Sequence, residues 1–334
     1  MPSLLLQAFE GTNKTTPLWF MRQAGRYLPE YQKIKKEFSL DEMFKTPSVA
    51  SDITAMPVKT LSVDAAILFS DILTLPSQMG FNISYGNDGP KIANTVNKTS
   101  DLKFIHDFDN LSFVYETIKL TVKKLPANIP LIGFTGSPFT VACYLIEGNG
   151  SGNFTKVFAF MYENPKDFHK LMDVLTKNTI THLQNQKKAG AKVFQLFDTW
   201  GGILRPADFA HFVLPYVKEI FKSVDLPSIY YLKNSAPLLS LMDQSGADFL
   251  SVCHTVVLGH NPVLEKTDKG IQGNLFNGLL YANDKTLIKE TEDVLAGAKH
   301  YKRYIFNLSH GVFPDISVDK MRLIVKTVHN YKRS

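Results

Sequence analysis

The stretch PLWFMRQAGRYLPEY, residues 17–31, sets the pattern that decides the fold. It starts apolar and extended, places Arg22 and Arg26 four residues apart around Gly25, and closes at Pro29. A short apolar strand followed by a turn and a helical segment then recurs along the whole chain. Strands that alternate with helices pair in parallel through crossover connections, so this rhythm predicts an α/β fold with a parallel sheet.

Eight short runs rich in β-branched and aromatic residues are predicted to be strands. They are Pro17–Arg22, Ala65–Ser70, Pro130–Gly136, Lys192–Asp198, Ser228–Lys233, Asp248–Cys253, Gly270–Leu275 and Tyr304–Ser309. Eight strands in a chain of 334 residues favour a single (β/α)₈ barrel domain over residues 1–334, since such barrels need roughly 250 residues. The competing fold is an open doubly wound sheet. That fold favours a glycine-rich nucleotide loop after the first strand, which residues 23–25 do not provide.

Helices are predicted between the strands, and part of the chain exceeds what a barrel needs. One helix should run from Pro165 to Ala189 and end at Gly190, and another from Pro206 to Val224; others follow Pro47, Asp109, Pro237, Asp284 and Ser317. The excess lies mostly in the first half, where residues 81–94 predict a hairpin insertion and residues 136–165 extra short helices. The fold prediction is therefore a barrel with additional N-terminal helices and a hairpin.

Composition indicates a globular protein and bears on its compartment and on the charge of its partner. A hydrophobic content of 44% supports a substantial core, and no apolar run reaches membrane-spanning length. The first residues lack the basic head of a signal peptide, and two cysteines make no disulfide framework, so we expect a cytoplasmic protein. The net charge of +6 suggests an anionic partner, but the lysines are scattered rather than clustered, which argues against nucleic acid.

Arginine is scarce, because only six of the 37 basic residues are arginines. Two of them, Arg22 and Arg26, nevertheless stand in one turn. The guanidinium group holds carboxylate or phosphate through two parallel hydrogen bonds, which lysine cannot do. The pair therefore indicates an anion-binding site; the alternative is two surface arginines at a helix start.

Polar residues follow the predicted strands, where a barrel places its active site. The strand ends give Arg22, Asp71, Gly136-Ser137-Pro138 with Tyr144 beyond, Asp198-Thr199, Lys233, Cys253-His254, residues 272–274 and His310. Each of these residues alone could be a turn residue or a helix cap. Together at one rim, they indicate a functional site.

Several motifs resemble those of one enzyme family. PLWFMRQAGRYLPEY and GFTGSPFTVACYLIEG (133–148) resemble the two signatures of the uroporphyrinogen decarboxylases, and segments 65–73, 196–204 and 306–315 follow in the family's order. The resemblance spans essentially the full chain. It implies one barrel, usually a homodimer, that converts uroporphyrinogen III to coproporphyrinogen III in tetrapyrrole biosynthesis without a cofactor or metal.

The resemblance also assigns roles. Asp71 would accept the pyrrole N–H groups and stabilise the ring cation, and either Arg22 or Tyr144 would donate the proton; the sequence leaves that choice open. Substrate-binding candidates are Arg22, Arg26, Lys35, Phe69, Asp71, Tyr144, Phe197, Thr199 and His310. A basic rim suits a tetrapyrrole that bears eight carboxylates, and protonation makes its own ring the electron sink.

The chain departs from the family's pattern at several positions. Lys35 replaces a common arginine, and Asn234, Cys253-His254 and Phe276-Asn277 replace the family's Gly, Asp-Trp and Asp-Pro. These departures put in doubt how one side of the pocket is formed.

Two alternatives come from other classes of protein. A zinc-dependent methyltransferase of the same barrel type would use His and Cys ligands, and Cys253 and His254 are candidates for them. Adjacent strand residues face opposite ways, however, and only Cys143 is left as a second thiolate. The other alternative is a porphyrinogen-binding protein without activity. Intact Arg22, Asp71 and Tyr144 argue against it.

Overall fold

Seven parallel strands form one curled sheet at the centre of the computed structural model, which describes residues 3–86, 89–98, 105, 107–150 and 152–332. In sheet order they are β1 (Ala66–Ile67), β4 (Leu131–Gly136), β5 (Val193–Asp198), β6 (Ser228–Leu232), β7 (Phe249–Ser251), β8 (Gly270–Leu275) and β9 (Tyr304–Leu308). Every neighbouring pair is parallel. Seven of the eight predicted strands are therefore present; Gly270–Leu275 has the predicted bounds, and the other six differ by at most three residues at either end.

The first predicted strand, Pro17–Arg22, does not form a regular ladder. Leu18 makes a single parallel bridge to Phe306 of β9, and its carbonyl oxygen accepts a hydrogen bond of 2.9 Å from the backbone N–H of Asp64, just before β1. Side chains interrupt the pairing, because Asp64 accepts the N–H of Leu18 and Asn307 accepts the N–H of Met21. The segment thus lies between β9 and β1, bonded on both sides.

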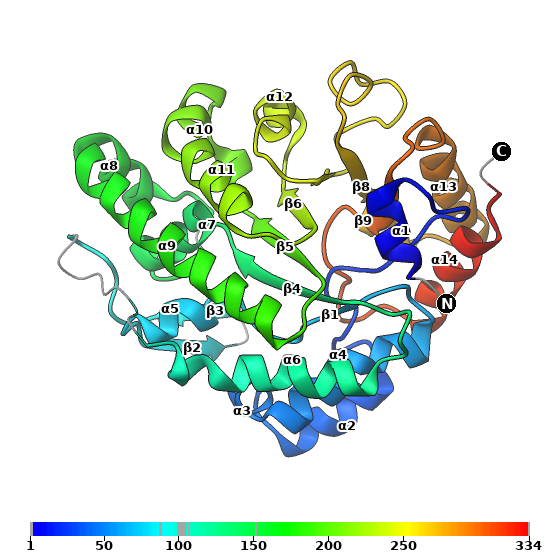
Figure 1. Cartoon of the computed structure of the whole chain (residues 1–334), viewed down its shortest axis with the longest axis horizontal. Coiled ribbons are helices and arrows are strands. Elements are labelled where there is room, and N and C mark those ends of the chain that lie inside the picture. The colour runs from blue at the N-terminus through cyan, green and yellow to red at the C-terminus, as the bar shows by residue number, and fades with distance from the viewer. Residues whose placement is uncertain (1–2, 87–88, 99–104, 106, 151, 333–334) are drawn as a thin grey trace.

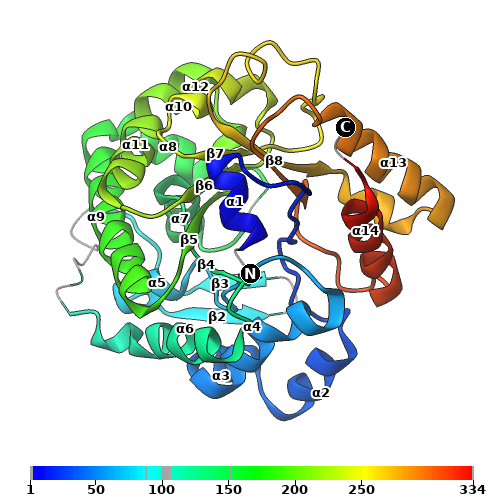
Figure 2. The same ribbon diagram turned by 45° about the vertical axis from the view of Figure 1, so that its right-hand side comes forward.

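Helices form a ring around the strands (Figures 1 and 2), as alternating strands and helices predict. Their bounds are α1 Leu4–Glu10, α2 Pro29–Glu37, α3 Leu40–Lys45, α4 Pro47–Leu61, α5 Thr74–Gln78, α6 Ser112–Lys124, α7 Pro138–Glu147, α8 Thr155–Glu163, α9 Pro165–Ala189, α10 Pro206–Phe212, α11 Leu214–Ser223, α12 Leu239–Asp243, α13 Asp284–Gly297 and α14 Val318–Asn330. Short 3₁₀ turns are Asp109–Leu111, Gly201–Ile203, Ala236–Leu238 and Asn277–Tyr281. No helix in the described ranges is long and apolar enough to cross a membrane.

The prediction of one helix from Pro206 to Val224 was wrong. The chain breaks at Val213 into α10 and α11, and Pro215 occupies the first turn of α11. Proline has no N–H to donate and its ring crowds the preceding turn, so it starts a helix more readily than it continues one. The helix over residues 165–189 is confirmed, and it ends at Gly190, whose φ of 123° suits glycine.

The hairpin insertion is confirmed as β2 (Ile83–Gly86) paired antiparallel with β3 (Gly89–Ile92). The residues of its turn, 87–88, lie outside the described residues. The additional short helices between residues 136 and 165 are α7 and α8. These insertions follow β1 and β4, at the end of the sheet where the polar strand ends collect.

Candidate active site

One cavity of about 370 Å³ lies at the carboxyl ends of the strands. It is lined by seven of the nine predicted site residues: Arg22, Phe69, Asp71, Tyr144, Phe197, Thr199 and His310. Asp71 follows β1, Thr199 follows β5 and His310 follows β9, so the strand-end rule holds at this rim. Arg26 and Lys35 are exposed and do not line the cavity. Their roles, like those of the other seven, stay predictions.

Asp71 is half-buried in the cavity wall. Its Oδ1 accepts the backbone N–H of Leu73 at 2.8 Å, a turn geometry in which Asp serves as a local acceptor. Burial raises the pKa of this carboxyl group, while the Leu73 N–H, a hydrogen bond from Tyr85 and the charge of Arg22 act in the opposite direction. The charged form of this group is therefore costly until a donor or cation compensates for it.

Arg22 reaches this cavity through an unusual backbone conformation. Its φ is +60°, a left-handed value that few non-glycine residues adopt. Its side chain passes so close to Gly311 that a Cβ at position 311 would come within 2.5 Å of Arg22 Cδ. The His310-Gly311 turn therefore needs glycine for the arginine to lie where it does.

A second cation and a neutral histidine complete this side of the cavity. Lys233, which follows β6, places its Nζ 5.4 Å from the ring centre of Trp200, within cation–π range. Burial, Arg22 and Lys233 together lower the pKa of His310 to about 4. The imidazole is thus uncharged at neutral pH, so the positive potential of the cavity comes from Arg22 and Lys233.

Tyr144 of α7 also lines the cavity. Burial is the main cause that raises its pKa, so the phenol keeps its proton at neutral pH. Its ring centre lies 6.3 Å from that of Trp200. A tyrosine held this way can donate a hydrogen bond or a proton to a molecule in the cavity.

Asp198 is a buried residue at the end of β5 that holds helix α7 in place. Its carboxylate accepts hydrogen bonds from Ser137 at 3.0 Å, Thr140 at 2.7 Å, Tyr230 at 2.8 Å and the backbone N–H of Gly201 at 3.0 Å. It thereby ties the first turn of α7 to the end of β5. Asp198 does not line the cavity, and its role is structural.

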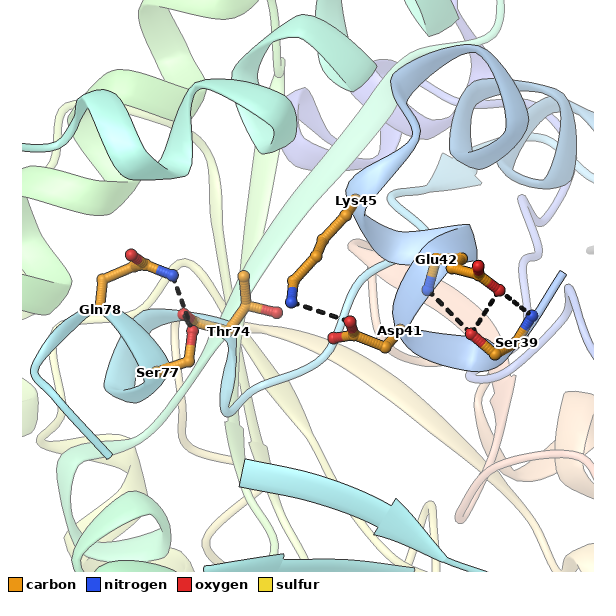
Figure 3. A network of polar contacts seen from close by, with 7 residues as sticks. All are labelled: Ser39, Asp41, Glu42, Lys45, Thr74, Ser77 and Gln78. Carbon is orange, nitrogen blue, oxygen red and sulfur yellow. Dashed lines mark hydrogen bonds and ion pairs between the residues drawn. The ribbon is translucent and has the colours of Figure 1, made fainter. Parts of the chain in front are cut away.

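The hairpin and α3 close the cavity on another side. Phe44 of α3 contacts Phe69 with ring centres 5.0 Å apart and Tyr85 of β2 at 5.8 Å. Phe44 also lines a second cavity of about 410 Å³, where Asp41 and Lys45 of α3 face Thr74, Ser77 and Gln78 of α5 (Figure 3). The N-terminus of α3 is fixed by a capping box between Ser39 and Glu42. The capped helix α3 therefore positions Phe44 between the two cavities.

Most departures from the family's pattern lie outside the cavity and contact one another. His254 packs on Phe276 with ring centres 4.4 Å apart, and its Nδ1 lies 3.2 Å from the hydroxyl of Ser309, which in turn donates to Asn277 at 3.4 Å. Asn234 has φ +57°, a left-handed value that glycine adopts freely and that Asn tolerates better than most other residues. None of these residues lines the cavity.

Cys253 and His254 do not converge on a common point. The Cys253 sulfur lies 2.9 Å from the Thr255 hydroxyl and 3.5 Å from the Ser235 hydroxyl, whereas His254 faces Ser309. Within the described ranges, no three or more His, Cys, Asp or Glu side chains are grouped so that they could hold a metal ion. The ligand set of the zinc-dependent alternative is not assembled there.

Sequence reasoning missed several cavity residues. Lys233 appeared among the strand ends but received no role, and Tyr231 of β6 was not considered. Phe44 comes from α3 and Pro90 from the hairpin, so neither follows a strand of the central sheet. Only the placement of the insertions over the cavity brings these residues in.

Solved structures with a similar fold support the architecture. A methyltransferase from Methanosarcina mazei superposes with a TM-score of 0.84 over 98% of both chains at 17% sequence identity. A structure described as a vitamin-B12-independent methionine synthase from Listeria monocytogenes gives 0.58 over 95% of this chain and 96% of that chain at 13% identity. At these identities the likeness concerns the fold alone.

Sequence relatives are much closer. Curated proteins named uroporphyrinogen decarboxylase are 42% identical in Thermodesulfovibrio yellowstonii (99% of both chains), 39% in Citrifermentans bemidjiense (96% of this chain, 95% of the other) and 40% in Aquifex aeolicus (94% of both). The sequence model of the family described as "Uroporphyrinogen decarboxylase (URO-D)" matches residues 2–331. The chain therefore belongs to the uroporphyrinogen decarboxylase family.

Proposed function

We propose that this chain removes the carboxyl groups of the four acetate side chains of uroporphyrinogen III, which yields coproporphyrinogen III in tetrapyrrole and haem biosynthesis. Family membership over nearly the whole chain supports this activity. The observation that carries it is the cavity itself, which Asp71 lines together with Arg22 and Lys233. A polyanionic macrocycle with central N–H donors needs this combination of one acceptor and surrounding cations.

The cationic, apolar and acceptor groups of the cavity would each contact a different part of the substrate. Arg22 and Lys233 pair with the carboxylates at the edge of the macrocycle, and Arg26 and Lys35 extend this basic rim outside the cavity. Phe69 and Phe197 provide apolar walls for the pyrrole rings, and Thr199 offers a hydroxyl to a carboxylate. Asp71 accepts the pyrrole N–H groups, which satisfies a charge that burial otherwise disfavours.

The chemical step belongs largely to the substrate. Protonation of the ring carbon beside an acetate arm makes the pyrrole an electron sink, and the C–C bond to the carboxylate then breaks with release of carbon dioxide. The Asp71 charge stabilises the cationic ring that forms in between. Arg22 and Tyr144 are the two candidate proton donors, and a comparison of kcat for Arg22→Lys and Tyr144→Phe would separate them.

The proposal includes the remaining expectations from the sequence. The chain is one closed (β/α)₈ domain over residues 1–334, in which segment Pro17–Arg22 completes the set of eight strands, and it works as a cytoplasmic homodimer without a cofactor or metal. The bonds from Leu18 to β9 and toward β1 support closure. A solution mass of twice the 37.5 kDa chain would support the dimer.

The test is anaerobic incubation of the purified chain with uroporphyrinogen III and chromatographic identification of the products. Coproporphyrinogen III with intermediates of seven, six and five carboxylates is the expected result. Tight binding of the substrate without turnover would instead support a non-catalytic binding protein. Methyl transfer that needs zinc would support the methyltransferase alternative, which the family match does not favour.

A further inference from the structure

Two histidines face each other on neighbouring helices away from the cavity. His169 of α9 and His211 at the end of α10 place their Nε2 atoms 3.3 Å apart. His169 is half-buried and His211 is exposed, so solvent ions can reach the pair. Neither residue lines the candidate active site.

The hydrogen bonds of Tyr216 fix the tautomer of His169. The Tyr216 hydroxyl lies 3.2 Å from the backbone carbonyl oxygen of His169, to which it donates, and 2.8 Å from His169 Nδ1. A phenol has one proton to give; when that proton goes to the carbonyl oxygen, Nδ1 of His169 carries a proton and the lone pair of the neutral ring is on Nε2, which faces His211.

The ring geometry fits two ligands of one ion better than a direct hydrogen bond. The ring centres lie 4.9 Å apart and the rings are perpendicular. A linear Nε2–H···Nε2 bond of the same length would hold the centres about 5.6 Å apart. Two imidazoles bound to one tetrahedral zinc ion at about 2.05 Å would have nitrogens about 3.3 Å and centres about 5.1 Å apart. The shorter distance between the ring centres shows that the two rings are bent away from the straight line of a linear hydrogen bond.

We propose that His169 and His211 form a two-histidine site for a divalent transition-metal ion of the zinc, nickel and copper class. Water would supply the other ligands, because no third His, Cys, Asp or Glu side chain joins them in the described part of the chain. Asp208 lies near His211, but its carboxylate is held by Arg205 at 2.7 and 3.0 Å and by Tyr162 at 2.8 Å. Both of its oxygens are therefore occupied, and we do not count it as a ligand.

The surroundings prepare the site for a cation. Phe212 stacks on His169 with ring centres 5.1 Å apart and meets His211 edge-on at 4.5 Å, so both rings are held in place. Hydrogen bonding of the second ring nitrogen, here to Tyr216, is the usual support of a metal-binding histidine.

The experiment uses the full chain without a histidine tag, washed with chelator and titrated by calorimetry with Zn²⁺, Ni²⁺, Cu²⁺ and Mg²⁺. We expect one saturable site with affinity in the order Cu²⁺ above Ni²⁺ and Zn²⁺, and none for Mg²⁺, as imidazole ligands dictate. His169→Gln and His211→Gln should each weaken binding at least tenfold. Tyr216→Phe removes only the supporting hydroxyl and should weaken it about tenfold.

The matched control is His260→Gln, which removes an exposed histidine outside the pair and should leave binding unchanged. In the copper-loaded protein, electron paramagnetic resonance should show coupling to two equivalent nitrogens, reduced to one in His211→Gln. Absence of saturable binding, or binding that His211→Gln does not weaken, would overturn the proposal. Decarboxylation should be the same with and without the ion, so the outcome is independent of the proposed activity.

Discussion

Replacement of Asp71 by Asn separates a catalytic role from a structural one. The Asn side-chain oxygen can still accept the Leu73 N–H that Asp71 accepts at 2.8 Å. Asn is nearly as good as Asp in such local caps, so the free energy of unfolding should change by less than about 1 kcal/mol. The charge, however, is lost from a position where burial already raises the pKa of the carboxyl group.

The size of the catalytic loss follows from Coulomb's law. A carboxylate about 4 Å from a ring cation stabilises it by about 4 kcal/mol at an effective dielectric constant of about 20. Loss of that interaction corresponds to about a 10³-fold fall in kcat, and removal of one preorganised electrostatic group usually costs at least about 10²-fold. We therefore expect a fall of about 10² to 10³ in kcat for Asp71→Asn. Asp71→Glu should also fail, because the extra methylene moves the carboxylate into the plane of the macrocycle.

The matched control is Asp107→Asn. Asp107 is exposed and makes the same local bond, since its Oδ1 accepts the N–H of Asp109 at 2.8 Å. Rates of coproporphyrinogen formation and thermal melting curves would be compared for wild type and both variants. Near-normal turnover of Asp71→Asn would leave Asp71 with only its turn-forming role and refute the reasoning.

Four further outcomes are expected. Gly311→Ala should displace Arg22, because the new Cβ would lie 2.5 Å from Arg22 Cδ. We expect kcat/KM to fall at least tenfold with little change in melting temperature. Unchanged kinetics would show that the position of Arg22 does not matter for the reaction. Arg26→Lys should raise KM, because it removes a charge-assisted bond worth about 1.5–3 kcal/mol, and an unaltered KM would exclude the clamp. Buried His182 has its pKa lowered to about 4 by burial, so the unfolded chain binds more protons below pH 6.5. Stability should then fall by on the order of 3 kcal/mol between pH 6.5 and 4, and denaturant unfolding should show a smaller fall in His182→Gln. Activity should survive chelator treatment, and a loss that zinc restores would favour the methyltransferase alternative.

Much of the fold could be predicted from the sequence because local signals and tertiary structure agree. The helix over residues 165–189 has a proline at its first position and a glycine after its last, and the structure has the same bounds. Segment 17–22 failed as a regular strand because the side chains of Asp64 and Asn307 take its N–H groups. These partners are distant in sequence, so no local pattern could reveal them.

The candidate site was predictable only where it lies on strand ends. Arg22, Asp71 and His310 follow strands or strand-like segments, and they share one cavity. Phe44 and the hairpin reach the site from insertions whose placement depends on packing, so they carry no strand-end signal. The contacts among His254, Asn277 and Ser309 could not be predicted either, because they form only when the loops after β7, β8 and β9 come together.

The most direct test of the central claim is a crystal structure of the chain with coproporphyrinogen III bound. The account predicts that the macrocycle occupies the cavity at the strand ends, with pyrrole nitrogens about 3 Å from the Asp71 carboxylate. Its propionate groups should pair with Arg22 or Lys233. A macrocycle bound outside this cavity, or one whose nitrogens do not contact Asp71, would contradict the account.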